Sequence, residues 1–198
     1  MIRVGVHLHS NYSADSNTSL IELVTTAQQL QLSRLALTDH NTAAGALELG
    51  RHEPGLAIVG EEVRTTEGEI IGLFISDTVA PDRTPEDVLD EIRAQGGVTY
   101  IPHPLDPYRA HFSRERMLEL ADRIDIVETY NQWCRPQFNR AASELAEEMR
   151  KPTACGSDAH EPEQLAHCWL EMPEFHSPRD FLDKLADARH MIAAAPVR

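Results

Sequence analysis

Short apolar runs alternate with longer amphipathic segments along most of the chain. Segment 85–95 shows the helical pattern most clearly, because Pro85 stands at its first turn and Gly96 and Gly97 directly follow it. Strands are predicted at 2–6, 35–37, 56–59, 70–75, 98–101, 124–127, 153–155, 167–172 and 192–195, and further helices at 19–32, 42–50, 113–121, 136–149 and 178–188.

The order of these elements gives about seven strand-then-helix units with short connections. Repeated units of this kind favour a parallel α/β sheet covered by helices. An open doubly wound sheet and a closed barrel both fit the pattern. Because no linker, repeat or low-complexity tract interrupts it, we predict one domain over residues 1–195, with 196–198 as a short tail.

The composition narrows the class of protein. The chain has 198 residues, and its 18 Lys and Arg against 32 Asp and Glu give a formal net charge of −14. Extended nucleic acid is therefore not expected as a partner, because nonspecific binding depends on cations that release counterions. Three cysteines without C-x-x-C spacing favour a reducing compartment. With no signal-peptide pattern and no apolar stretch of roughly 20 residues, we expect a cytoplasmic protein without a membrane partner.

Polar residues that can bind metal follow five of the predicted strands. Residues just past the ends of parallel strands lie on one face of a sheet or barrel, so we expect these side chains to converge. Imidazole and carboxylate together suit Zn, Mn or Fe, and one catalytic zinc needs about three protein ligands. The set is therefore large enough for two or three divalent ions, a kind of centre that typically serves hydrolysis at phosphorus. The candidates are His7, His9, Asp15, His40, Glu62, His103, Asp158 and His160.

The ordered motifs that carry these residues resemble one family. They are His-Leu-His-Ser at 7–10, Thr-Asp-His at 38–40, Gly-Glu-Glu at 60–62, His-Pro at 103–104 and Gly-Ser-Asp-Ala-His at 156–160. Taken together they resemble the polymerase and histidinol phosphatase (PHP) family of metal-dependent phosphoesterases. The resemblance implies a single-domain distorted (β/α)7 TIM-like barrel with a trinuclear metal centre at the C-terminal ends of the strands.

The resemblance also implies how the metal ligands are shared. One ion would be held by His7, His9, Glu62 and Asp158, and a second by Asp15, His40 and His160. Glu62 would bridge to a third ion, completed by His103 and one further residue.

Two positions depart from the family pattern. Many relatives place a histidine in the strand after the Gly-x-Glu motif, where this chain has Glu69, which we take as the replacement ligand. An aspartate often precedes the first histidine pair, where this chain has Gly5. We expect Asp39 to orient His40 or to cap the following helix rather than to bind metal.

Other polar side chains near the predicted ligands are candidates for the site. Glu128, Asn131 and Arg135 follow the predicted strand 124–127 and resemble the family's E-x-x-N segment. Arg135 can clamp a phosphate through two N–H groups, and Arg109 is a similar case. We therefore assign phosphate binding to Arg109, Asn131 and Arg135.

The predicted function is hydrolysis of a small phosphomonoester, of the sugar, nucleotide or histidinol-phosphate type, by a metal-activated hydroxide. One alternative is a 5′-end exonuclease or phosphodiesterase acting on short oligonucleotides. A second is a noncatalytic metal-binding regulatory module. The chain has no room for a sizeable insertion over the site, so we expect an open site, while the sequence leaves the metal, the substrate and the oligomeric state open.

Overall fold

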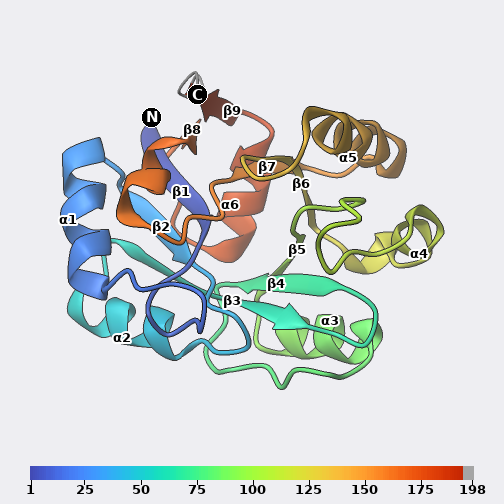
Figure 1. Ribbon diagram of the computed structural model, residues 1–198, viewed down its shortest axis with the longest axis horizontal. Coiled ribbons are helices and arrows are strands. Elements are labelled where there is room, and N and C mark those ends of the chain that lie inside the picture. The colour runs from blue at the N-terminus through green and yellow to red at the C-terminus, as the bar shows by residue number, and fades with distance from the viewer. Residues whose placement is uncertain (194–198) are drawn as a thin grey trace.

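The structure is a computed structural model that describes residues 1–193 of the chain. Within these residues, nine strands form one mixed sheet that curves into a nearly closed barrel (Figure 1). The strands are β1 (Ile2–Leu8), β2 (Arg34–Leu37), β3 (Ala57–Arg64), β4 (Glu69–Leu73), β5 (Val98–Ile101), β6 (Ile126–Asn131), β7 (Thr153–Gly156), β8 (Cys168–Met172) and β9 (Arg189–Ile192). Their order in the sheet is β7-β6-β5-β4-β3-β2-β1-β8-β9.

Strand β1 closes the barrel because different parts of one edge have different partners. Its first half pairs with β8 in antiparallel orientation, with Val4 opposite Leu170. Farther along, the main-chain oxygen of Val6 accepts a hydrogen bond from the Ser157 N–H at 3.1 Å, just after β7. Strands β1 to β7 therefore form the barrel predicted above, and β8 and β9 extend the sheet beyond it.

The predicted all-parallel arrangement is wrong for several strands. Strand β4 is antiparallel to both β3 and β5, because a tight turn after Thr65 folds β4 directly back on β3. Strands β8 and β9 also run antiparallel to their neighbours. The sequence pattern did not reveal this, since the turn replaces the crossover helix that a parallel pair requires.

Several predicted strands were too short, β3 and β6 by the most, and one was misplaced. Strand β3 continues to Arg64 through its pairing with β4, and β6 continues to Asn131 through its pairing with β7. Glu62 and Glu128 consequently lie inside strands rather than after them. The last strand begins at Arg189 instead of 192, and residues 194–195 of that prediction and the tail 196–198 lie outside the described residues.

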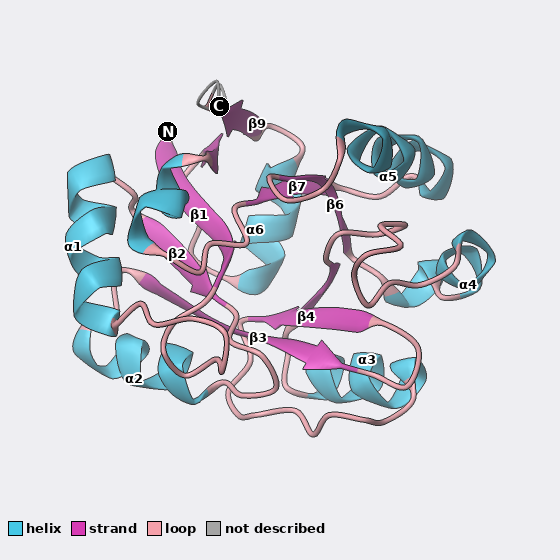
Figure 2. Cartoon of the chain, viewed as in Figure 1, coloured by secondary structure: helices cyan, strands magenta, loops and turns pink. Residues whose placement is uncertain are grey.

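Helices cover the outside of the barrel (Figure 2). The capping box of Ser19 and Glu22 is present at the start of the first helix, and Thr84 caps the helix that begins at Pro85. Among the described residues, no helix is both long and apolar enough to span a membrane. The helices are α1 (Leu20–Leu30), α2 (Ala44–His52), α3 (Pro85–Ala94), α4 (Arg114–Glu119), α5 (Pro136–Met149) and α6 (Pro178–Leu185), with short 3-10 helices at Ala121–Arg123 and Pro162–Ala166.

Alternation along the strands separates the barrel interior from the layer under the helices. Ala36 belongs to the inner core, whereas its neighbours Leu35 and Leu37 pack outward against the helices. On β3, Ile58 is in the inner core, so the two-residue period places Glu62 inside the barrel and Glu61 outside. The inner core also includes side chains from β8 and α6.

Substitution of Phe181, on α6, tests this assignment of the core. Phe181 is 1% exposed and packs against Phe175 and Phe74 at centroid distances of 4.9 and 5.3 Å. We expect Phe181→Ala to reduce the free energy of unfolding by about 3–5 kcal/mol, because it leaves a cavity in the core. The matched control is Ile21→Ala, at a side chain that is 78% exposed on α1, with an expected change of less than about 0.5 kcal/mol. Equal losses in urea unfolding of the two variants would contradict the core assignment.

Candidate metal centre

Every side chain predicted to bind metal lies at the C-terminal end of the barrel. His7 is on β1 with His9 just after it, and Glu62 and Glu69 are on the hairpin of β3 and β4. The others are in the connections that follow β1, β2, β5 and β7: Asp15, His40, His103, Asp158 and His160. Four overlapping groups of three have ligand atoms within 4.8 Å of one another, and together they include all of these residues except Asp15, which contacts His40 and His160.

The first predicted ligand group is fully buried. The Nε2 atoms of His7 and His9 lie 3.2 and 3.3 Å from Glu62 Oε2, and His9 Nε2 lies 3.2 Å from Asp158 Oδ1. Two ligand atoms that are each about 2.1 Å from one ion lie about 3.0–3.4 Å apart. The spacing therefore fits a single ion held by these side chains.

The second group is open to solvent. Asp15 Oδ2 lies 3.3 Å from Nε2 of both His40 and His160. The Asp15 side chain is 53% exposed, whereas the carboxylates of the first group are buried. Solvent and small molecules can therefore reach the centre from this side.

The third group contains the replacement ligand predicted from the sequence. Glu62 Oε1 lies 3.0 Å from His103 Nε2, and Glu69 Oε2 lies 3.7 Å from the same nitrogen. Glu69 is the first residue of β4 and its side chain is only 15% exposed, so it is not an exposed turn glutamate. Glu62 turns one oxygen toward His7 and His9 and the other toward His103, as a bridging carboxylate requires.

A buried nitrogen without a partner supports a fit to metal. His9 Nε2 is buried among the ligand carboxylates and makes no hydrogen bond. An unpaired buried polar atom is costly. A cation between Glu62 and Asp158 would satisfy His9 Nε2, so the residues present fit a divalent ion there.

Neighbouring groups fix which nitrogen of each imidazole faces the centre. His7 Nδ1 is 2.9 Å from Glu128 Oε1, and His160 Nδ1 is 2.9 Å from the main-chain oxygen of Asp158. His9 Nδ1 is 3.3 Å from Ser13 Oγ. With Nδ1–H assigned as the donor in these contacts, Nε2 of each ring is left for a metal.

Glu128 has a larger role than the sequence indicated. It is buried on β6, where it also accepts hydrogen bonds from the Tyr100 hydroxyl and the His103 N–H, both at 2.6 Å. A Cβ on Gly156 would stand 1.8 Å from Glu128 Oε1, so only glycine fits beside it. The available signal was the two-residue period, because Glu128 follows Ile126 on the inner face.

Asp39 organises the connection between β1 and α1. It accepts hydrogen bonds from the Ser10 N–H at 2.6 Å and the Ser13 hydroxyl at 3.1 Å, while Ser13 Oγ accepts the His40 N–H at 2.9 Å. Asp39 therefore orients His40 through Ser13. The alternative expectation is wrong, because helix α2 has Ala43 at its N-cap and no side-chain cap.

The backbone is strained at three of the predicted ligands. His7, His103 and Asp158 have φ values of 57°, 29° and 46°, in the left-handed region that non-glycine residues rarely adopt. His7 also lies at an irregularity in the register between β1 and β2. Such conformations cost about 1–3 kcal/mol each and persist where the surrounding structure enforces them. Here they direct imidazole and carboxylate groups into the centre.

Electrostatic interactions keep the buried carboxylates ionised. Burial raises the pKa of Asp158, but His7 and His9 more than offset this and hold the pKa well below its usual range. The pKa of Glu62 is likewise lowered despite burial, chiefly by His7 and His103. Burial lowers the pKa of His7, but the carboxylates of Glu62, Glu128 and Asp158 more than offset this and hold it well above its usual value. Glu62 and Asp158 are thus ionised at neutral pH.

The three predicted phosphate-binding residues differ in position. Arg109 Nη2 donates to Asp158 Oδ2 at 2.6 Å, and the Asn131 amide donates to Glu128 Oε2 and Asp158 Oδ2 at 3.0 and 3.3 Å. Arg109 and Asn131 therefore contact the centre through its carboxylates. Arg135 is exposed at the start of α5, with its guanidinium 4.6 Å from the ring centroid of Tyr108.

Comparison with known sequences finds relatives of unassigned function. One uncharacterised protein of Methanocaldococcus jannaschii is 29% identical over 169 residues, which cover 78% of this chain and 97% of the relative. A second uncharacterised protein of the same organism is 33% identical over 162 residues, covering 76% of this chain and 65% of the relative. The chain thus spans about two thirds of the second relative.

Solved structures share the fold. A two-domain protein of Bacteroides vulgatus, described as containing a predicted PHP-like metal-dependent phosphoesterase, matches with a TM-score of 0.74 and 16% identity, over 96% of this chain and 64% of that one. An amidohydrolase of Chromobacterium violaceum with bound sulfate matches with a TM-score of 0.70 and 17% identity, over 94% of this chain and 97% of the amidohydrolase. At these identities the matches establish the fold alone.

Two family models match the sequence itself. The PHP domain matches residues 5–78, which include the first three motifs from His7 to Glu62, and the PHP-associated model matches residues 136–189, which include Asp158 and His160. Together these matches cover more than half of the chain, and the barrel fold agrees with them. The chain belongs to the PHP domain family.

Proposed function

We propose that the protein is a metal-dependent phosphoesterase that hydrolyses a small phosphomonoester. The observation that supports this most strongly is the placement of Glu62, whose two oxygens face separate histidine groups in one buried centre. Carboxylate and imidazole donors suit Mn, Fe or Zn. When bound, two or three such ions would activate water and neutralise charge on the phosphate oxygens.

The ligand assignment follows the three groups described above. His7, His9, Glu62 and Asp158 would hold the first ion. The second would be held by Asp15, His40 and His160, and the third by Glu62, His103 and Glu69.

The chain's own residues hold these ligands and receive the substrate. Glu128 orients His7 by accepting its Nδ1–H, and Asn131 holds Glu128 and Asp158 in place. Arg109 donates to Asp158 through Nη2 alone, and its side chain is only partly buried. The remaining N–H groups of its guanidinium are therefore available to a phosphate oxygen. The substrate would approach from the exposed side of Asp15.

A substrate panel tests the proposed activity. The protein is loaded with Mn, Fe or Zn and assayed on phosphomonoesters, phosphodiesters and short 5′-phosphorylated oligonucleotides. We expect release of inorganic phosphate from monoesters. Cleavage of the oligonucleotides with no monoester hydrolysis would favour the nuclease alternative. Stoichiometric metal uptake with no hydrolysis of any ester would favour a noncatalytic module.

Substitutions in the first group test the site assignment. We expect His9→Ala and Asp158→Ala each to lower the bound metal content and to reduce hydrolysis to background, because each removes a buried ligand. Metal content is measured by mass spectrometry and folding by circular dichroism. The matched control is His176→Ala, at a histidine outside the centre before α6, which should retain both metal and activity. The assignment is wrong if the first two variants keep both.

Replacement of Glu69 tests the third ion separately. We expect Glu69→Ala to retain two equivalents of metal where the parent retains three, because it removes the carboxylate near His103. Glu67→Ala, which removes a carboxylate from the preceding turn, should leave the metal count unchanged; Glu67 pairs with Arg116 instead. Equal metal counts in the parent and Glu69→Ala would remove Glu69 from the ligand set.

A further inference from the structure

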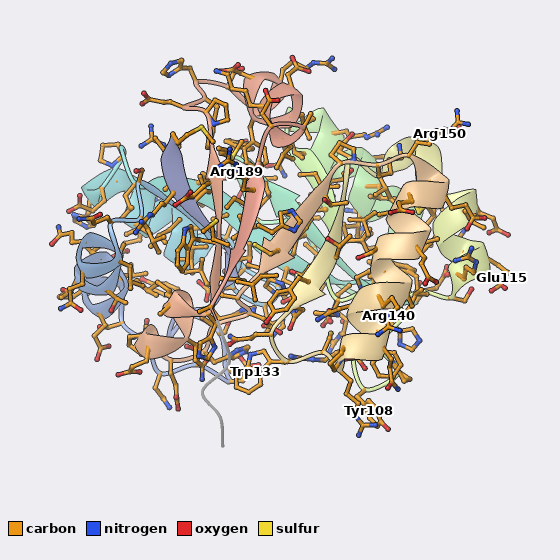
Figure 3. All side chains as sticks on the ribbon, turned by 90° about the horizontal axis from the view of Figure 1, so that it is seen from above. Tyr108, Glu115, Trp133, Arg140, Arg150 and Arg189 are labelled. Carbon is orange, nitrogen blue, oxygen red and sulfur yellow. The ribbon has the colours of Figure 1, made fainter. Side chains whose placement is uncertain are left out.

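The indole ring of Trp133 is held beside the centre. Trp133 lies in the connection between β6 and α5 and is 46% exposed, yet its indole N–H donates to the main-chain oxygen of Asp158 at 2.9 Å. Trp133 and Tyr108 project from the same edge of the molecule (Figure 3). A large aromatic ring that is held at its N–H and partly exposed to solvent is available to pack against a ligand.

A cleft joins this ring to the proposed metal ligands. It has a volume of about 380 Å³, and its lining includes Asp15 and His160 of the second group as well as Trp133. This volume falls in the range of small-molecule sites. A phosphoester whose phosphate lay at the centre could therefore place its alcohol portion in the cleft, against Trp133.

The charge of the cleft restricts what can enter it. Its lining includes Glu22 and Glu161 in addition to Asp15, and none of its lining residues is Lys or Arg. Hydrogen bonds from Ser19 lower the pKa of the Glu22 carboxyl, which keeps it ionised at neutral pH. A second anionic group on the substrate would be repelled, whereas a neutral or cationic group with hydrogen-bond donors would be accepted.

We propose that this cleft is the leaving-group subsite of the enzyme and selects phosphomonoesters whose alcohol carries a flat, uncharged or cationic ring that stacks on Trp133. The proposal rests on the phosphoesterase activity proposed above. Among small phosphomonoesters, it favours a nucleoside monophosphate over a bare sugar phosphate or a substrate with a second anionic group.

A matched pair of substrates tests the stacking. Adenosine 5′-monophosphate and ribose 5-phosphate release the same kind of primary alcohol and differ in the base. Because base–aromatic stacking is worth about 1–3 kcal/mol, we expect kcat/KM to favour the nucleotide by roughly tenfold. Trp133→Leu should bring the ratio close to one, whereas Trp133→Phe should preserve most of it.

The two variants separate stacking from a merely structural role. Both remove the indole N–H that reaches Asp158, so a structural role would reduce kcat/KM for both substrates equally in both variants. A nucleotide-to-sugar ratio that is unchanged in Trp133→Leu would overturn the subsite even if both substrates were hydrolysed.

A second pair of substrates tests the charge of the cleft. We expect benzyl phosphate to be hydrolysed with a higher kcat/KM than 4-carboxybenzyl phosphate, and Glu161→Gln to narrow this difference by a factor of about two to ten. Glu163→Gln is the matched control, because it removes the same charge from the short helix that Glu161 caps, but Glu163 does not line the cleft. If Glu161→Gln and Glu163→Gln changed the ratio of the two kcat/KM values equally, Glu161 would have no local role in substrate selection.

Binding of adenosine separates failure of the subsite from failure of the phosphoesterase. Calorimetry with adenosine, on protein without added metal, should show binding that Trp133→Leu abolishes and Glu163→Gln retains. If adenosine binds in this way while no phosphomonoester is hydrolysed, the cleft is a ring-binding site but the proposed phosphoesterase activity is wrong. Absence of adenosine binding in the parent would overturn the cleft as a ring-binding site whatever the enzyme hydrolyses.

Discussion

The Asp158 N–H donates a hydrogen bond to the main-chain oxygen of His7 at 2.7 Å, and this contact joins the end of the seventh strand to the first. The same contact brings Asp158 Oδ1 to 3.5 Å from His7 Nε2 and 3.2 Å from His9 Nε2. The contact that closes the barrel therefore also holds the first group together, and a sheet left open between β1 and β7 would separate Asp158 from His7 and His9. The β8–β9 extension leaves this contact free, because β8 pairs only with the first half of β1.

Gathering several carboxylates and imidazoles inside a barrel has a free-energy cost that the surrounding residues reduce. Glu128 is the central support, since it accepts hydrogen bonds from His7, Tyr100, Asn131 and the His103 main chain. Its fit depends on Gly156, where any side chain would collide with it. The strained backbone at His7 and Asp158 adds to the cost. A centre built in this way is preorganised, because its ligands are fixed by hydrogen bonds to protein groups before a metal binds.

The surroundings of the centre are uneven in charge. Arg109 donates to Asp158, whereas the cleft beside Trp133 is lined by Glu22 and Glu161 and by no Lys or Arg. In the arrangement we propose, the phosphate lies near Arg109 and the alcohol portion near Trp133. The overall charge of −14 is thus an incomplete guide to what the site accepts, because part of it comes from groups that would hold cations.

Much of the site could be predicted from the sequence because its signals are local. A polar motif after an apolar run marks the end of a strand, which is how Glu62 was identified, and the resemblance to the family singled out Glu69. The two-residue period that separates Glu62 from Glu61 applies only once β3 is known to continue to Arg64. Helix limits were also well predicted, since Pro85, Pro136 and the capping box at Ser19 act through their nearest neighbours.

Tertiary structure decided the features that depend on distant partners. The reversed direction of β4, the extension of β6 to Asn131 and the irregularity at His7 follow from pairing between strands, which no local pattern encodes. The role of Glu128 depends on contacts with His7, far away in sequence, and the position of Trp133 on its hydrogen bond to Asp158. The sequence by itself therefore determined which side chains could bind metal and that strands would carry them to one end. Only the folded chain determined how they are supported and what lies beside them, because those contacts exist only once the barrel has closed.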